Sequence, residues 1–169
     1  MGNGIGAWHA IEATRRNHAL EHAAVAVLLE RGGFRRSIVG RSTPSGFYIY
    51  GRLSRPELES AVAEALRRLQ RGEEEWAVSP FCGTNLAVAG TLAALSVLAV
   101  VGNRSRVAQL PNAIVAAVAS LLAAQPLGRL AQKYVTTSPH LQGVRVTGIT
   151  EYALGPLRYY RIDTEQAAA

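Results

Sequence analysis

The pattern of hydrophobic and polar positions divides the 169-residue chain into parts of different character. Residues 86–101 contain no charged side chain, and residues 110–127 contain none either. Each stretch, with its neutral neighbours, is near the lower limit of about 17 residues for a transmembrane helix. The short link 102–106 suits a tight connection between two helices. The pattern predicts a two-helix transmembrane hairpin over residues 83–128, and a buried helical hairpin in a soluble protein is the alternative.

Two further helices are predicted in the N-terminal part. No proline or glycine interrupts the chain from Ala7 to Arg31, and alanine and leucine are frequent there, so we expect a helix over residues 7–30. Ser54 and Glu57 have the spacing of a capping box and open a second helix. This second helix is amphipathic, because its apolar residues recur at helical spacing: Leu58, Val62, Ala65, Leu66 and Leu69.

Several short segments are rich in β-forming residues or alternate between apolar and polar positions. They are residues 36–40, 47–50, 144–149 and 157–162. The first two flank a polar turn at residues 41–46, which predicts a β-hairpin. The tail from Thr164 is expected to be frayed.

Together these elements predict an α+β membrane protein in three segments. Residues 1–82 form a cytoplasmic α/β domain with a β-hairpin and two helices. Residues 83–128 form the transmembrane hairpin. Residues 129–169 form a short C-terminal β segment that packs on the N-terminal domain.

Charge supports a membrane partner rather than nucleic acid. The net charge of +6 comes from scattered or paired arginines and one lysine, with no long basic run. Positive residues flanking the predicted hairpin outnumber those in its link: Arg67, Arg68, Arg71, Arg129 and Lys133 against Arg104 and Arg106. The positive-inside rule therefore predicts a two-pass protein with both termini in the cytoplasm and the lipid bilayer as its partner.

The sequence around His18, Glu21 and His22 reads His-x-x-Glu-His, the inverted order of a zinc-binding motif. On a helix the two histidines lie about 40° apart around the axis, so both rings can reach one metal ion. The carboxylate of Glu21 lies between them, where it can accept a proton from metal-bound water. The pattern predicts zinc ligands at His18 and His22 and a general base at Glu21, against the alternative that both histidines are structural.

A catalytic zinc ion needs a third protein ligand, and the sequence offers several. The only cysteine, Cys82, is the first candidate, because a thiolate binds zinc well; its alternative reading is a small buried hydrophobe. The run Glu73–Glu75 is the second candidate and His140 the third.

The motif also carries two resemblances. Residues 16–70 resemble the inverzincins, the pitrilysin-type zinc metallopeptidases, in the His-x-x-Glu-His helix, a Thr-Ser turn with a Tyr-Tyr pair, and a following helix rich in Leu and Glu. This resemblance implies that His18 and His22 bind zinc and that Glu21 is the base. Nearly the whole chain resembles an uncharacterised bacterial family of small two-pass membrane proteins, on the motif, residues 40–48 and residues 82–85 before the hairpin. This second resemblance implies the bacterial inner membrane.

The sequence therefore predicts a membrane-anchored zinc-dependent hydrolase, specifically a small metallopeptidase acting on peptide substrates. The alternative is a non-catalytic membrane subunit, assembly factor or metal-binding module. A small hairpin of this kind can also associate with a second copy or with another membrane protein.

Overall fold

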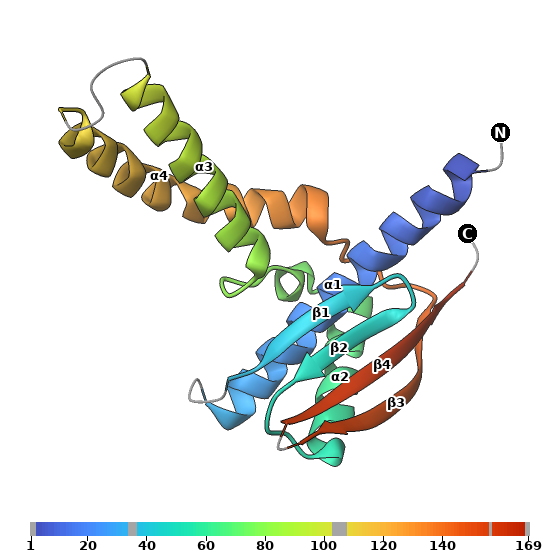
Figure 1. The fold of residues 1–169 in the computed structure, drawn as a ribbon. Coiled ribbons are helices and arrows are strands. Elements are labelled where there is room, and N and C mark those ends of the chain that lie inside the picture. Colours follow the sequence, from blue (N-terminus) through green and yellow to red (C-terminus); the bar gives the residue numbers. More distant parts are fainter. Residues whose placement is uncertain (1–2, 34–36, 103–107, 156, 168–169) are drawn as a thin grey trace. The chain divides into compact units, whose positions relative to one another are not determined.

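The computed structural model describes residues 3–33, 37–102, 108–155 and 157–167. It separates into two compact units, which are described one at a time. The first comprises residues 1–79 and 136–169, and the second comprises residues 80–135. The described residues have α+β architecture, with four α-helices and one four-stranded antiparallel sheet (Figure 1).

The sheet of the first unit combines strands from both ends of the chain. Its strands are β1 (Val39–Thr43), β2 (Gly46–Tyr50), β3 (Val144–Leu154) and β4 (Leu157–Gln166). They lie in the order β1-β2-β4-β3, and every neighbouring pair is antiparallel. The first hairpin closes in two residues, because Thr43 pairs with Gly46. At Gly46 the backbone φ is 143° and an added Cβ would collide with the carbonyl of Ile162, so glycine is required there.

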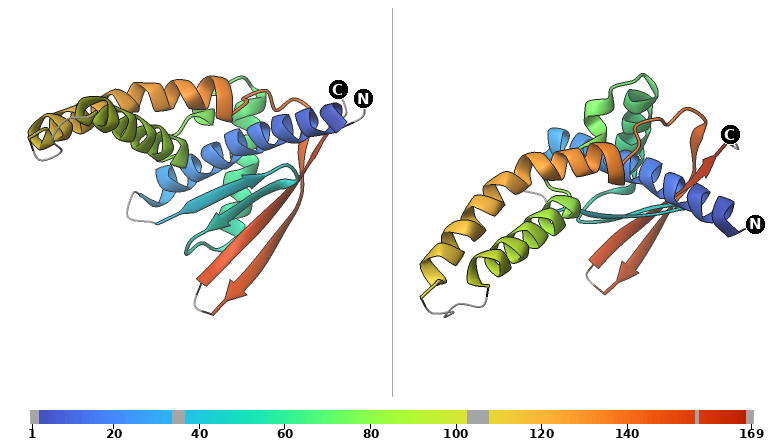
Figure 2. Two further views of the ribbon diagram at one scale, coloured as in Figure 1. Left: turned by 45° about the horizontal axis from the view of Figure 1, so that its top comes forward. Right: turned by 90° about the horizontal axis from the view of Figure 1, so that it is seen from above.

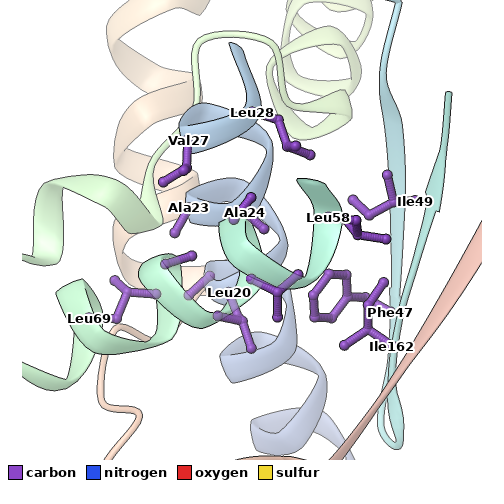
Figure 3. Packing of buried hydrophobic residues seen from close by; sticks show 14 of the residues in the cluster. Leu20, Ala23, Ala24, Val27, Leu28, Phe47, Ile49, Leu58, Leu69 and Ile162 are labelled. Carbon is purple, nitrogen blue, oxygen red and sulfur yellow. The ribbon is translucent and has the colours of Figure 1, made fainter. Parts of the chain in front are cut away.

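Two helices pack against one face of this sheet. They are α1 (Asn3–Gly32) and α2 (Arg55–Gln70) (Figures 1 and 2). Their apolar sides meet Phe47 and Ile49 of β2 and Ile162 of β4, which point inward at alternate strand positions (Figure 3). Leu20 and Leu58 lie fully buried between the two helices and these strand residues. The core therefore fixes α1 against the sheet through the helical turns that carry the histidine motif.

The second unit is a helical hairpin of α3 (Gly83–Val101) and α4 (Leu110–Ala131), which continues into a π-helical turn, η2 (Gln132–Thr136). Both helices are long and apolar enough to cross a membrane. No described residue of α3 is buried. The hairpin helices approach closely at Gly128, where an added Cβ would collide with Asn85, and Gln132 Nε2 donates to Asn85 Oδ1 at 2.7 Å. A small residue and a polar contact thus join the two helices at this end.

The sequence predicted the element types but misplaced several boundaries. The first strand was expected at residues 36–40 and runs at 39–43, so the turn is shorter than predicted. The helical hairpin expected over residues 83–128 does begin at Gly83, the first residue of α3, and its second helix, α4, continues to Ala131. The tail predicted to fray from Thr164 remains in β4 to Gln166, since the Thr164 hydroxyl is buried and donates to Asn17. Ser54 caps α2 by position, but its side chain makes no capping hydrogen bond in the described structure.

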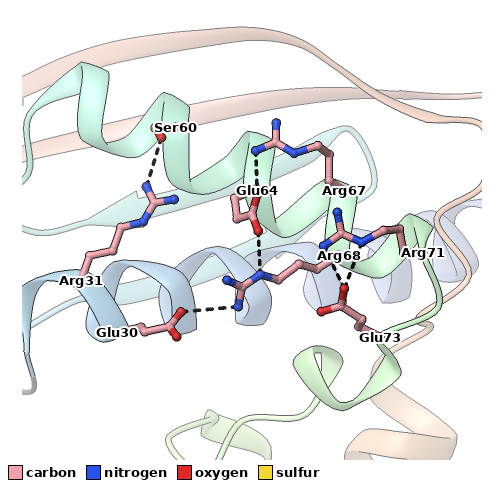
Figure 4. Close-up of polar contacts among 8 residues, drawn as sticks. All are labelled: Glu30, Arg31, Ser60, Glu64, Arg67, Arg68, Arg71 and Glu73. Atoms are coloured by element: carbon pink, nitrogen blue, oxygen red, sulfur yellow. Dashed lines mark hydrogen bonds and ion pairs between the residues drawn. The ribbon is translucent and has the colours of Figure 1, made fainter.

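A network of ion pairs on α2 joins it to α1 (Figure 4), and a cation–π contact joins it to the 3-10 turn η1 (Glu74–Ala77). Glu64 accepts from Arg67 at 2.6 Å and from Arg68 at 2.8 Å, and Arg68 also pairs with Glu30 of α1. The Arg68 guanidinium lies 4.1 Å from the ring centre of Trp76 in η1. Arg68 therefore contacts three elements at once.

Because of this network, the free energy of unfolding depends on pH. Hydrogen bonds from Arg68 and Arg67 lower the pKa of Glu64 to about 2. Because the folded-state pKa lies below the ordinary value of about 4.3, the stabilisation is complete above that ordinary value and is lost as the pH falls towards 2. We expect Glu64→Gln to lower the melting temperature at pH 7 slightly and to reduce the loss of stability between pH 5 and pH 3. Thermal unfolding across this range tests it, with Glu59→Gln on the same helix as control; an unchanged pH profile would contradict the assignment.

Candidate metal centre

Helix α1 brings the two predicted histidine ligands together. The ring centres of His18 and His22 are 4.3 Å apart, and the planes are tilted by 59°. One ring nitrogen of each histidine lies within 4.8 Å of the other. Zinc binds each imidazole nitrogen at about 2.0–2.1 Å, so two nitrogens that share one ion lie no more than about 4.2 Å apart, slightly closer than the 4.8 Å limit found here.

Backbone carbonyl groups from two other segments orient both rings. His18 Nδ1 donates to the carbonyl oxygen of Thr136 at 2.9 Å, and His22 Nδ1 donates to that of Ala77 at 2.8 Å. A carbonyl oxygen only accepts, so each Nδ1 carries the proton and the neutral ring has its lone pair on Nε2. Histidines that bind metals are held in this way, with one nitrogen bonded to a neighbour and the other directed at the ion.

His22 provides the most informative observation. The residue is only 4% exposed, and its Nε2 atom is buried with no hydrogen-bond partner among the described residues. Buried polar atoms are nearly always paired, because an unpaired one loses its interaction with water without replacement. A metal ion bound at Nε2 would supply the missing partner. Two imidazole nitrogens are donors that zinc accepts.

The carbonyl that orients His22 is itself held in place. Ala77 is the last residue of η1, and the preceding Trp76 lies under the guanidinium of Arg68. The Glu64–Arg68 ion pair therefore supports η1. The Ala77 carbonyl oxygen of η1 accepts the hydrogen bond from His22 Nδ1. This support extends from the surface of α2 to the candidate centre.

Glu21 lies between the two histidines in sequence, but its carboxylate contacts β1. The residue is 7% exposed, and the Ser42 hydroxyl donates to Glu21 Oε2 at 2.5 Å. The side chain also packs against Gly40, where an added Cβ would lie only 2.6 Å from Glu21 Cγ. Glu21 is therefore fixed against the strand, and its predicted role as a base stays a prediction.

Asn17, next to His18 on α1, joins this helix to the sheet. Its Nδ2 donates to the carbonyl oxygens of Thr43 and Pro44 at 2.8 and 3.2 Å, and its Oδ1 accepts from Thr164 at 2.8 Å. The amide is fully buried and all three contacts involve the β1–β2 turn or β4. The preceding residue, Arg16, donates to Gln166 of β4 at 3.3 Å.

The candidates for a third ligand lie in different places. Within the described part of the first unit, no further histidine, aspartate or glutamate joins His18 and His22 in a metal-sized group. Glu73 pairs with Arg71 at 2.8 Å, and His140 is exposed. Cys82 belongs to the second unit, where it is the N-cap of α3 and its Sγ accepts from the Thr84 N–H at 3.3 Å. Its role as a ligand stays a prediction.

Sequence reasoning missed the groups that orient the site. The carbonyl groups of Ala77 and Thr136 carry no sequence signal, since every residue has one. Ser42 and Gly40 lie within or beside the polar segment that was interpreted as a turn, and their contact with Glu21 depends on how β1 packs against α1. Two nearby residues in a strand facing a carboxylate cannot be identified from a single sequence.

These features define a class: a small α+β protein with paired, carbonyl-oriented histidines on its first helix and two helices of membrane-spanning length. The chain belongs to the family described as a domain of unknown function (DUF6391), whose model matches residues 13–149. It is also 35% identical over 134 residues to an uncharacterized protein of Picosynechococcus sp., and the match covers 73% of this chain and 65% of that protein. No solved structure matches the chain.

Proposed function

We propose that this protein is a membrane-anchored zinc-dependent hydrolase, specifically a small metallopeptidase. The observation that carries the metal site is the buried His22 Nε2, which has no partner among the described residues while Nδ1 is bonded to a carbonyl oxygen. His18 presents the same tautomer one helical turn earlier. Two oriented imidazoles with adjacent lone pairs favour a transition metal over a hydrogen-bonded structural role.

The membrane anchor is the α3–α4 hairpin. Its large apolar side chains are exposed in the described structure, including Leu86 at 77%, Leu98 at 69% and Leu122 at 72%. A water-soluble protein rarely leaves such a continuous apolar surface uncovered. The excess of positive residues outside the hairpin link supports cytoplasmic termini, and the proposed location is the inner membrane of a bacterium.

Cys82 is the proposed third ligand, on grounds of chemistry and chain distance. Thiolates are common zinc ligands, and zinc sites that hydrolyse substrates use three protein ligands and one water. Cys82 lies five residues after Ala77. The carbonyl oxygen of Ala77 accepts the hydrogen bond from His22. Five residues span at most about 18 Å, so the chain is long enough for the thiol to reach the histidines.

When bound, zinc would polarise a scissile carbonyl group and lower the pKa of a coordinated water. Glu21 would accept the proton of that water and pass it to the leaving amine, as the resemblance of residues 16–70 to the inverzincins implies. A peptide is the proposed substrate on the same basis.

One observation favours a second candidate, a non-catalytic metal-binding module or membrane subunit. The carboxylate of Glu21 is already hydrogen-bonded to Ser42 and packed against Gly40. A carboxylate that only fastens α1 to β1 would look the same. In that case the metal would stabilise the domain and no reaction would follow.

Glu21→Gln separates the two candidates. If Glu21 is the base, the variant keeps its zinc and loses hydrolysis of fluorescein-labelled casein by about 10²–10⁴-fold, the usual contribution of general base catalysis. Metal content and casein hydrolysis are measured on the same detergent-purified samples, with Glu59→Gln as the control. The metal-binding module would be favoured if the wild type and Glu21→Gln both bind zinc and hydrolyse casein equally. It would also be favoured if both bind zinc and the wild type does not hydrolyse casein.

A further inference from the structure

Two residues of β1 contact the Glu21 side chain and fix its position. Gly40 and Ser42 are two residues apart in β1, so they face the same side of the strand. At Gly40 the Glu21 side chain fills the volume that a Cβ would need, since its Cγ lies 2.6 Å from that position. At Ser42 the hydroxyl donates to Glu21 Oε2. The strand therefore provides a gap for the side chain and a donor for its oxygen.

Without these contacts, the Glu21 carboxylate would be able to bind the metal ion itself. Glu21 follows His18 by three residues, so on the helix surface it is a neighbour of His18, and His22 is the next residue along the chain. Carboxylate oxygen is a good zinc ligand at about 2.0–2.2 Å. A free glutamate side chain has three rotatable bonds and would be drawn to a dication beside it. Bound there in addition to the water, it would raise the coordination number of the ion from four to five.

We propose that Gly40 and Ser42 are positioning residues that hold Glu21 out of the metal's coordination shell. The inference rests on the metal site proposed above. Gly40 admits the side chain to the surface of β1, and Ser42 binds the carboxylate oxygen there. Glu21 then remains beside the metal without binding it, and the ion keeps an open coordination position.

Cobalt(II) reports this directly, because its visible absorption is strong in four-coordinate sites and weakens when a fifth ligand binds. The experiment loads the full-length protein in detergent with Co²⁺ alone and compares Ser42→Ala with the wild type. We expect Ser42→Ala to weaken the visible bands and to bind Co²⁺ several-fold more tightly, because the released carboxylate becomes a ligand. Ser42→Thr keeps the hydroxyl and should restore the wild-type spectrum.

Three further variants make the assignment specific. Gly40→Ala should weaken the bands as well, since its Cβ would displace Glu21 from the strand. Ser45→Ala removes a hydroxyl from the same hairpin, one bonded to Arg161, and should leave the spectrum unchanged. The double variant Ser42→Ala/Glu21→Gln should return to the wild-type spectrum, because no carboxylate remains to bind.

The two levels of the hypothesis fail in different ways. Co²⁺ that binds with the same spectrum in the wild type, Ser42→Ala and Gly40→Ala would overturn the positioning role while leaving the metal site standing. A weakened spectrum that persists in the double variant would also overturn it, because Glu21 would not be the new ligand. A wild-type protein that binds no Co²⁺ would overturn the metal site and this inference together.

Discussion

His22→Ala should remove the zinc from the protein. We expect the detergent-purified wild type to hold about one zinc ion per chain, and the variant to bind zinc at least about 100-fold more weakly. The reason is that His22 Nε2 is the buried donor without another partner among the described residues, and its ring is already oriented by Ala77. Losing an oriented ligand costs more than losing one of the groups behind it, which alone changes metal affinity about 10–100-fold.

The measurement is elemental analysis of purified protein, with His9→Ala as the matched control. His9 lies on the same helix but is exposed, so its removal should leave the zinc content unchanged. Cys82→Ala extends the test to the proposed third ligand and should also lower the zinc content. A His22→Ala variant with full zinc content, or a wild type that stays without zinc after reconstitution, would show that the histidines are structural.

The histidine pair could be predicted because its geometry is local. Residues four apart on a helix share a face whatever the rest of the chain does, and the alanine- and leucine-rich context makes that helix secure. The sheet strands were recognisable for the same reason, since Phe47 and Ile49 alternate with outward-facing tyrosines. The apolar stretches of α3 and α4 needed only length and composition.

The orienting contacts could not be predicted, because each depends on segments far apart in sequence. Thr136 is 118 residues from His18, and Ala77 is 55 residues from His22. Both act through backbone carbonyl groups, which no side-chain pattern marks. The boundary of β4 was missed for a similar reason: Thr164 looks like a polar tail residue until its hydroxyl meets Asn17 across 147 residues.

Asn17 shows how a residue beside a motif can be essential without touching a metal. Its amide is fully buried and uses both of its functional groups, donating to Thr43 and Pro44 and accepting from Thr164. It therefore ties α1 to the first hairpin and to the last strand, immediately before His18. This contact fixes the helix against the sheet at the level of the candidate centre.

Asn17→Asp should destabilise the folded protein by about 3–5 kcal/mol, the range for a buried charge left without a counter-charge. The change preserves the shape of the side chain but replaces the donor Nδ2 with an oxygen that faces two carbonyl oxygens. Urea unfolding in detergent, followed by tryptophan fluorescence, measures the loss as a lower midpoint.

Gln166→Glu is the matched control, because it makes the same amide-to-carboxylate change in a half-buried side chain of β4 that also contacts α1. That variant should stay within about 1 kcal/mol of the wild type, since a partly exposed carboxylate remains hydrated and faces Arg16. Equal midpoints for Asn17→Asp and Gln166→Glu would mean that burial of the Asn17 amide does not hold α1 to the sheet, and the fixed geometry of the neighbouring histidines would then have to come from the apolar core alone.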